Sequence, residues 1–177
     1  MFMTTYQGRE IDVLNPNINK IDIQDISHAL SFIARGNGHI KYFYSVAQHC
    51  INCCLEAKNQ GYSNKIQLLC LLHDASEAYL SDIVRPVKGL LPQYLEIENK
   101  LQNTIYSKYI KEPITKDELE KMKIIDDSLL NMEFQLLMKV NVKKIEPINY
   151  DLQFKQTEFD IIKSKFIQLF NELIENQ

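Results

Sequence analysis

Tryptophan is absent from this 177-residue sequence, and glycine and proline are scarce, with five residues of each. Because glycine and proline mark turns and interrupt helices, their scarcity favours long helices over a fold with many strands and turns. No internal repeat and no low-complexity linker divides the chain, and its length suits one domain. We therefore expect a single helical domain over residues 1–177.

Long apolar runs are also missing. The longest uninterrupted apolar stretch, residues 68–72, is far too short to span a bilayer, and residues 1–9 contain no apolar signal core. We therefore expect a soluble, cytoplasmic protein with no membrane partner.

The sequence has no excess of basic residues. It contains 20 Lys and Arg against 23 Asp and Glu, for a net charge of −3. A protein that coats a nucleic-acid polymer is normally basic, so we do not expect such a partner. A small anionic substrate remains compatible, because a few well-placed cations matter more than the total charge.

Cysteine is the one potential metal ligand that forms a cluster in the sequence. Three of the four cysteines, Cys50, Cys53 and Cys54, fall within five residues, and Cys70 follows later. The spacing Cys50-x-x-Cys53 is half of a common zinc motif, but no second Cys-x-x-Cys follows. We interpret the cysteines as small buried residues in a reducing compartment rather than as a zinc site.

The spacing of apolar residues predicts a compact all-α helical bundle. The predicted helices cover about 22–34, 43–60, 64–80, 93–110, 115–139 and 155–175. Thr115-x-x-Glu118 is a capping-box pattern at the start of one of them. We expect an irregular arm with a short strand over 4–18, and loops over 35–39, 82–92 and 141–151, of which the second could also be a broken helix.

Histidine is rare, and one of the four histidines is informative. His73-Asp74 closes the most apolar predicted helix. A histidine and a carboxylate are costly to bury unless they are paired or bind a metal ion. Glu77 follows one turn later, on the face of His73, and Asp82 follows where the helix should end. Four ionisable groups therefore gather at one helix end.

His49 and Asp126 lie in two other apolar helical segments. Taken alone, His49 is most simply a hydrogen-bonded core residue, Asp126 a solvated carboxylate, and His28 a structural residue. Taken with His73 and Asp74, the first two form a set of imidazoles and carboxylates. Such a set suits one divalent transition metal ion, namely zinc, cobalt, manganese or iron.

The order His49 … His73-Asp74 … Asp126 resembles the signature of the HD superfamily of metal-dependent phosphohydrolases. Further segments resemble consecutive motifs of its 5′-deoxynucleotidase branch: residues 45–49, 71–79 and 82–88, and Asp126-x-x-Leu129-Leu130-x-x-Glu133. The likeness covers about residues 20–138. The sequence is also similar to phage-encoded HD enzymes that remove the whole triphosphate from dATP, and the motifs do not separate these two groups.

This resemblance implies a role for each matching residue. His49, His73, Asp74 and Asp126 would ligate the ion, and Glu77 and Asp82 would position water or transfer protons. Arg35 and Lys88 would hold the substrate phosphates, to which magnesium could also bind. Without the resemblance, Arg35 and Lys88 could equally be ordinary surface cations.

Two positions need a decision. Asp126 and Asp127 are adjacent, and we choose Asp126 as the ligand because it keeps the spacing to Leu129, Leu130 and Glu133. The related deoxynucleotidases usually carry an aromatic residue after the arginine, whereas this chain has Gly36. We expect substrate contacts from Asn37, His39 or Tyr79 instead.

The expected function is hydrolysis of deoxynucleotide phosphoesters. The reaction would release phosphate from a deoxynucleoside 5′-monophosphate or triphosphate from a dATP-type substrate. The alternatives are an HD hydrolase of another phosphoester, such as an alarmone or a cyclic dinucleotide, and a catalytically silent nucleotide-binding domain. The resemblance further implies a homo-oligomer, in the host cytoplasm if a phage encodes it.

Overall fold

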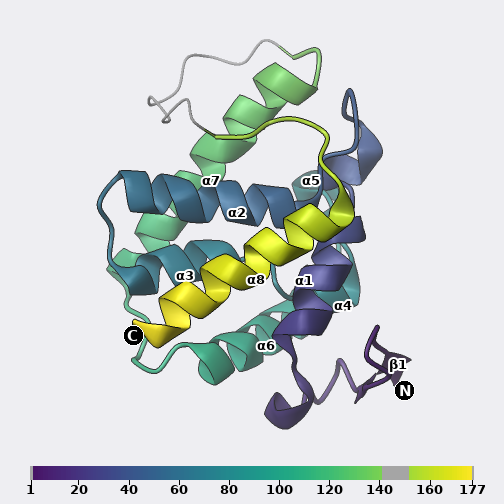
Figure 1. Cartoon of the computed structure of the whole chain (residues 1–177). Helices are drawn as coiled ribbons and strands as arrows, with labels where there is room; N and C mark the ends of the chain where they lie inside the picture. The colour runs from purple at the N-terminus through teal and green to yellow at the C-terminus, as the bar shows by residue number, and fades with distance from the viewer. Residues whose placement is uncertain (1, 141–151, 177) are drawn as a thin grey trace.

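The computed structural model describes residues 2–140 and 152–176 and confirms the predicted compact, mostly helical fold (Figure 1). Its helices are α1 (Ile23–Phe32), α2 (Val46–Asn59), α3 (Asn64–Leu72), α4 (Glu77–Leu80), α5 (Arg85–Lys88), α6 (Pro92–Tyr109), α7 (Lys116–Leu137) and α8 (Phe159–Glu175). Short 3-10 turns, η1 (Ile18–Lys20) and η2 (Arg35–Gly38), flank α1. The predicted loop over 141–151 lies outside the described residues.

Helices α2 and α3 pack side by side in the centre of the molecule, and the other long helices pack around them. The C-terminal helix α8 crosses α1, α2 and α3, so the chain end closes one side of the core (Figure 1). Helix α7 packs on α2 and α3 through a smaller cluster that includes Ile125 and Leu129. Helices α7 and α8 are therefore both held by contacts with residues far away in the sequence.

Local capping explains where two of the helices begin. Ser45 and Gln48 form a capping box, so α2 begins at Val46 rather than at the predicted residue 43. Thr115 and Glu118 form the capping box that the sequence pattern predicts, and α7 follows directly. Each box satisfies backbone N–H groups that a helix start otherwise leaves without partners.

The predicted helix over 64–80 is wrong in one respect, because the structure breaks it after Leu72. Residues 73–76 form a tight turn before α4. Gln102 of α6 enters this break: its amide nitrogen donates to the Leu72 carbonyl at 2.7 Å, and its amide oxygen accepts from the Ser76 N–H at 3.0 Å. A side chain that inserts into the backbone ladder in this way ends a helix, and the sequence of the helix alone does not reveal it.

The N-terminal arm contains the predicted short strand. Strand β1 (Met3–Thr4) pairs antiparallel with β2 (Glu10–Ile11). The buried carboxylate of Asp25 accepts hydrogen bonds from the Thr5 hydroxyl and the Gln7 N–H, which fastens the arm to α1. The arm also covers His28, whose ring stacks on that of Tyr6 with 3.6 Å between centroids.

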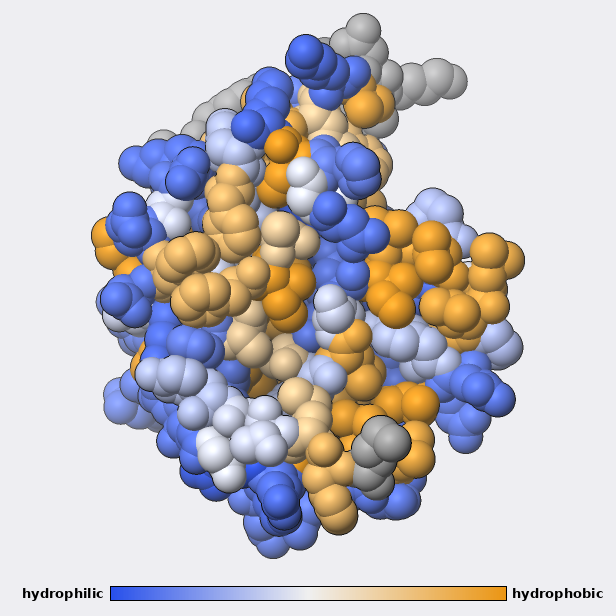
Figure 2. All heavy atoms as spheres, turned by 90° about the vertical axis from the view of Figure 1, so that its right-hand side faces the viewer, coloured by the Kyte–Doolittle hydropathy of each residue, from blue (hydrophilic) through white to orange (hydrophobic). Residues whose placement is uncertain are grey.

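The surface carries scattered apolar side chains between polar ones. Figure 2 shows such hydrophobic patches bordered by hydrophilic residues on one face of the molecule. Among the most exposed apolar side chains are Leu90 and Phe32, at 78% and 53%. Over residues 2–140 and 152–176, no helix is long and apolar enough to cross a membrane.

We expect the substitution Phe166→Ala to lower the free energy of unfolding by about 3–5 kcal/mol, the usual cost of a large cavity in a core. Phe166 on α8 is fully buried against the central helices. The matched control is Ile161→Ala on the same helix, where the side chain is 59% exposed and the cost should stay below about 0.5 kcal/mol. Urea unfolding measures both values, and equal costs would contradict the packing of α8 as part of the core.

Candidate metal centre

Side chains from three helical segments meet at one point beside the α3–α4 break. His49 Nε2 lies 3.2 Å from His73 Nε2 and 3.1 Å from Asp126 Oδ1. Asp74 Oδ2 lies 3.3 Å from His73 Nε2 and 3.9 Å from His49 Nε2. The structure thus brings together all four residues that the resemblance implies as metal ligands.

Both imidazoles are held with the same nitrogen facing this point. His73 Nδ1 lies 2.8 Å from the carbonyl oxygen of Cys70, which can only accept, so Nδ1 carries the proton. His49 Nδ1 lies 2.7 Å from Glu133 Oε1 and donates to that carboxylate. In the neutral imidazoles the lone pairs of both Nε2 atoms therefore point toward the carboxylates of Asp74 and Asp126.

Four electron-pair donors that face one another require a cation between them. Burial lowers the pKa of His73, but the neighbouring carboxylates, Asp74 foremost, outweigh burial and hold that pKa well above its usual value. Burial raises the pKa of Asp126, but its hydrogen bonds to His49 and His73 outweigh burial and lower that pKa. A proton or a metal ion can fill this position, and the two compete for it.

The spacing of the four donor atoms fits a metal ion. Ligand atoms about 2.0–2.2 Å from a zinc-like ion lie roughly 3.0–3.5 Å from one another. The separations between these atoms, 3.1–3.9 Å, are close to that range. The second nitrogen of each imidazole is already hydrogen-bonded, as it commonly is in metal sites.

Two thiols also lie close to this point. His49, Cys53 and His73 form one group positioned to bind a metal ion, and Cys50, His73 and Asp74 form another. All four cysteines are free and buried, as the sequence analysis predicts. Burial raises the pKa of the Cys53 thiol well above its usual value, so without an ion this group stays protonated.

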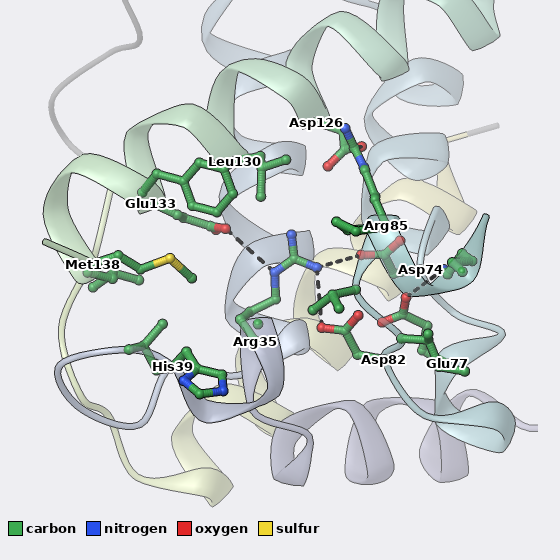
Figure 3. Close-up of a pocket in the computed structure, with 18 residues that line it drawn as sticks. Arg35, His39, Asp74, Glu77, Asp82, Arg85, Asp126, Leu130, Glu133 and Met138 are labelled. Atoms are coloured by element: carbon green, nitrogen blue, oxygen red, sulfur yellow. Dashed lines mark hydrogen bonds and ion pairs between the residues drawn. The ribbon is translucent and has the colours of Figure 1, made fainter. Parts of the chain in front are cut away.

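A cavity of about 340 Å³ opens beside the four donors (Figure 3). Its polar lining includes five carboxylates and three cations: Asp74, Glu77, Asp82, Asp126, Glu133, Arg35, Arg85 and Lys88. Its apolar lining is Ile40, Ile83, Val84, Leu130, Phe134 and Leu137, together with Met138. The cavity thus combines one charged wall with one apolar wall, a common composition of small-ligand sites.

Arg35 lies at the centre of the charged wall (Figure 3). Its guanidinium is 3.3 Å from Asp74, 3.5 Å from Glu133 and 3.9 Å from Asp82. Burial lowers the pKa of this guanidinium, but the three carboxylates outweigh burial and raise it. Arg35 is therefore a half-buried, permanently charged group and not an ordinary surface cation.

Glu77 and Lys88 form the far side of the charged wall. Glu77 is 3% exposed, and its Oε2 has no hydrogen-bond partner among the described residues. Burial and the nearby carboxylates of Asp74 and Asp82 raise the pKa of Glu77 well above its usual value. Lys88 Nζ lies 2.7 Å from Glu98 and 3.5 Å from Glu77, so this cation is also paired.

The three expected substrate contacts outside the charged wall differ in position. His39 lines the cavity, whereas Asn37 is exposed and does not line it. The prediction for Tyr79 is wrong in its geometry, because Tyr79 is 8% exposed and packs in the main hydrophobic core.

The structure explains why position 36 is a glycine. Its φ of +56° lies in the left-handed region, and a Cβ there would meet Met138 Cε at 2.9 Å. Met138 follows α7 and lines the cavity, so it occupies the space beside Arg35. Met138 therefore occupies space that a larger side chain at position 36 would need.

Sequence analysis assigned no role to two residues that the structure places in the site. Glu133 holds His49 and Arg35 together, and Arg85 donates to Asp126 Oδ2 and to Asp127 Oδ1, each at 2.5 Å. Glu133 lies seven residues, or two helical turns, after Asp126, so its position on the same face could have indicated it. Arg85 lies in the segment 82–88 that resembles a deoxynucleotidase motif, but its contact with Asp126 depends on how α5 meets α7.

Two curated proteins are similar to this chain. One is the uncharacterized protein YfdR of Escherichia coli strain K12, 39% identical over 113 residues, or 64% of this chain and 61% of the relative. The other is an uncharacterized protein of Rhodobacter capsulatus, 36% identical over 107 residues, or 58% of this chain and 55% of the relative. This chain spans less than two thirds of the length of either one. No protein-family model matches the chain.

We expect Asp126→Asn to remove most bound metal, because Asp126 Oδ1 lies 3.1 Å from His49 Nε2. The matched control is Asp127→Asn, which should keep the metal, since the Asp127 side chain is 40% exposed and pairs with Lys123 and Arg85. Metal content of the purified variants measures this difference, with circular dichroism to verify the fold. Loss of metal in the Asp127 variant alone would show that the assignment is one residue out of register.

Proposed function

We propose that this protein is a metal-dependent phosphohydrolase that acts on a small deoxynucleotide. The observation that carries the proposal is the convergence of His49, His73, Asp74 and Asp126 on one point at the edge of a cavity that also holds cations. The motif order that resembles the HD superfamily supports the same chemistry. The metal centre would hold one divalent transition ion.

The charge of the cavity supports a role for the ion in substrate binding. Carboxylates outnumber cations five to three in its lining. A phosphate would be repelled by that excess, and a divalent ion at the four donors would offset it. The ion would also supply Lewis acidity toward a phosphoryl oxygen and activate a water molecule for attack on phosphorus.

The cations of the cavity would hold the substrate phosphates. Arg35 offers a planar fork that suits two phosphate oxygens, and Lys88 offers a point charge on the opposite side. Arg85 is the most accessible of the three, with its side chain 54% exposed against 12% and 19% for Arg35 and Lys88. Arg85 is therefore best placed to reach the outer phosphates of a longer chain.

Glu77 would act on protons rather than on the ion. Its partnerless carboxylate oxygen, low exposure and raised pKa suit a group that exchanges a proton with water or with the leaving group. Asp82 lies 3.9 Å from Arg35 and would orient that guanidinium.

The apolar wall would receive the sugar and base. Leu130, Phe134 and Leu137 of α7 line the cavity, and Met138 lies beside Gly36. A nucleotide fits such a site, because its phosphates suit the charged wall and its base and sugar suit the apolar wall.

The decisive experiment is a substrate screen with purified protein and added manganese, cobalt or zinc. Deoxynucleoside mono- and triphosphates, their ribose counterparts, an alarmone and a cyclic dinucleotide would be tested with phosphate and triphosphate resolved as products. We expect hydrolysis of at least one deoxynucleotide. Metal binding without hydrolysis of any nucleotide would favour the silent nucleotide-binding domain instead.

The variant Glu77→Ala should retain the metal but lose about 100-fold or more in turnover, the usual scale for a positioned acid–base group. The four donors do not include Glu77, so metal content should match the wild type. The control Glu120→Ala removes an exposed glutamate that does not line the cavity and should leave turnover unchanged. Wild-type turnover in metal-loaded Glu77→Ala would reject the role given to this residue.

A deoxynucleotide should be cleaved about ten to a hundred times more efficiently than its ribose counterpart. A buried hydroxyl without a partner costs about 1–3 kcal/mol, and each 1.4 kcal/mol corresponds to about a factor of ten in rate. The apolar wall of α7 and Met138 offers no hydrogen-bonding side chain to a 2′-hydroxyl. The comparison is kcat/KM for dAMP against AMP and for dATP against ATP, and equal values within each pair would reject the deoxynucleotide proposal.

A further inference from the structure

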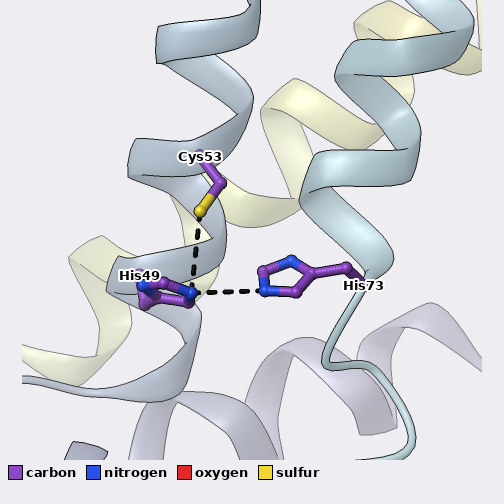
Figure 4. Close-up of side chains that lie close together, drawn as sticks. All are labelled: His49, Cys53 and His73. Carbon is purple, nitrogen blue, oxygen red and sulfur yellow. Dashed lines mark hydrogen bonds between the residues drawn. The ribbon is translucent and has the colours of Figure 1, made fainter. Parts of the chain in front are cut away.

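A thiol lies on the inner side of the proposed metal centre. Cys53 Sγ is 3.6 Å from His49 Nε2, and Cys53, His49 and His73 have ligand atoms within 4.8 Å of one another (Figure 4). Cys53 is 1% exposed and is not part of the cavity lining, whereas Asp74 and Asp126 line the cavity. The Cys53 thiol therefore approaches the proposed metal centre from the protein interior, and the carboxylates of Asp74 and Asp126 approach it from the cavity.

The sequence of α2 explains why Cys53 faces the imidazole. Cys53 follows His49 by four residues, so the two side chains lie one above the other on one helix face (Figure 4). Two ligands at this spacing on a helix can contact the same ion without any change in the backbone. Cys54, one residue further, is equally buried but packs in the main hydrophobic core and belongs to neither ligand group.

The separations match those between neighbouring nitrogen and sulfur ligands of one ion. With zinc–sulfur near 2.3 Å and zinc–nitrogen near 2.0–2.1 Å, tetrahedral neighbours lie about 3.5 Å apart for sulfur and nitrogen and about 3.4 Å for two nitrogens. The corresponding distances here are 3.6 Å for Cys53 to His49 and 3.2 Å for His49 to His73. Cys53 Sγ therefore already lies at ligand–ligand distance from His49 Nε2.

We propose that Cys53 is an additional metal ligand, and that it makes the centre selective for thiophilic ions such as Zn²⁺ and Co²⁺ over Mn²⁺ and Mg²⁺. The inference rests on the proposed metal centre and adds a soft ligand to its two imidazoles and two carboxylates. Soft thiolate favours zinc and cobalt, whereas carboxylate oxygen serves the harder ions. On binding, the thiol proton passes to solvent, because only the thiolate ligates.

Cys50 is the competing thiol. It groups with His73 and Asp74 but not with His49. Cys50 and Cys53 are three residues apart on α2, so both border the site. Cys53 contacts His49 Nε2, the nitrogen that lies 3.2 Å from His73 and 3.1 Å from Asp126. The test must therefore separate the two thiols.

The test uses the whole protein, freed of metal with a chelator and kept reduced without oxygen. Addition of Co²⁺ to the wild type should produce a near-ultraviolet sulfur-to-cobalt charge-transfer band that saturates at one ion per chain. The band should vanish in Cys53→Ser and Cys53→Ala but persist in Cys50→Ser and in the buried control Cys54→Ser. Competition titrations should show Zn²⁺ affinity lowered about tenfold or more in Cys53→Ala, the scale of losses at metal-supporting residues, with little change for Mn²⁺.

The outcomes separate this inference from the proposed function. Wild-type protein that binds one Co²⁺ without the sulfur band would overturn the role of Cys53 and leave the phosphohydrolase proposal standing. A band that persists in both Cys53 variants and vanishes in Cys50→Ser would also overturn it. Wild-type protein that binds no ion at all would overturn both proposals. If the Cys53 variants fail to fold, Cys50→Ser decides the matter: a sulfur band that persists in this variant supports Cys53, and a band that vanishes with one Co²⁺ still bound overturns it.

Discussion

Two imidazole nitrogens that face each other at 3.2 Å set the main physical constraint on this protein. The other nitrogen of each ring is already committed, to Glu133 for His49 and to the Cys70 carbonyl for His73. Two carboxylates lie within 3.1–3.3 Å of these same nitrogens. Arg35 and Arg85 compensate part of the carboxylate charge, and a proton or a metal ion at the centre would separate the converging lone pairs.

The surrounding charges follow from that constraint. Glu133 fixes the orientation of His49, but a carboxylate that is 4% exposed needs a partner of its own, and Arg35 supplies it. Arg35 in turn also contacts Asp74 and Asp82. One guanidinium therefore links the metal centre to the cavity, and a substrate phosphate would have to compete with these carboxylates for it. This coupling gives the site a rigid charged wall in the absence of substrate.

The backbone makes a matching adjustment at His73. A continuous helix would separate His73 and Asp74 by about 100° around its axis and would carry Glu77 beneath His73. The structure instead breaks the helix after Leu72, where Gln102 bonds to the Leu72 carbonyl and the Ser76 N–H, and Asp74 and Glu77 both line the cavity. Buried backbone groups at a helix end need hydrogen-bond partners. The amide of Gln102 supplies these partners at the break.

The sequence by itself determined the helical class, most helix positions and the set His49, His73, Asp74 and Asp126, because apolar periodicity, caps and rare buried ionisable residues are local signals. Tertiary structure alone decided the break after Leu72, the inward turn of Tyr79, the contact of Arg85 with Asp126 and the wall that Met138 provides beside Gly36. Each of these depends on side chains from segments more than 20 residues apart, and local periodicity carries no information about such contacts. Cys53 stands between the two cases, since its spacing from His49 was visible in the sequence but its approach to His73 required α2 and α3 to pack side by side.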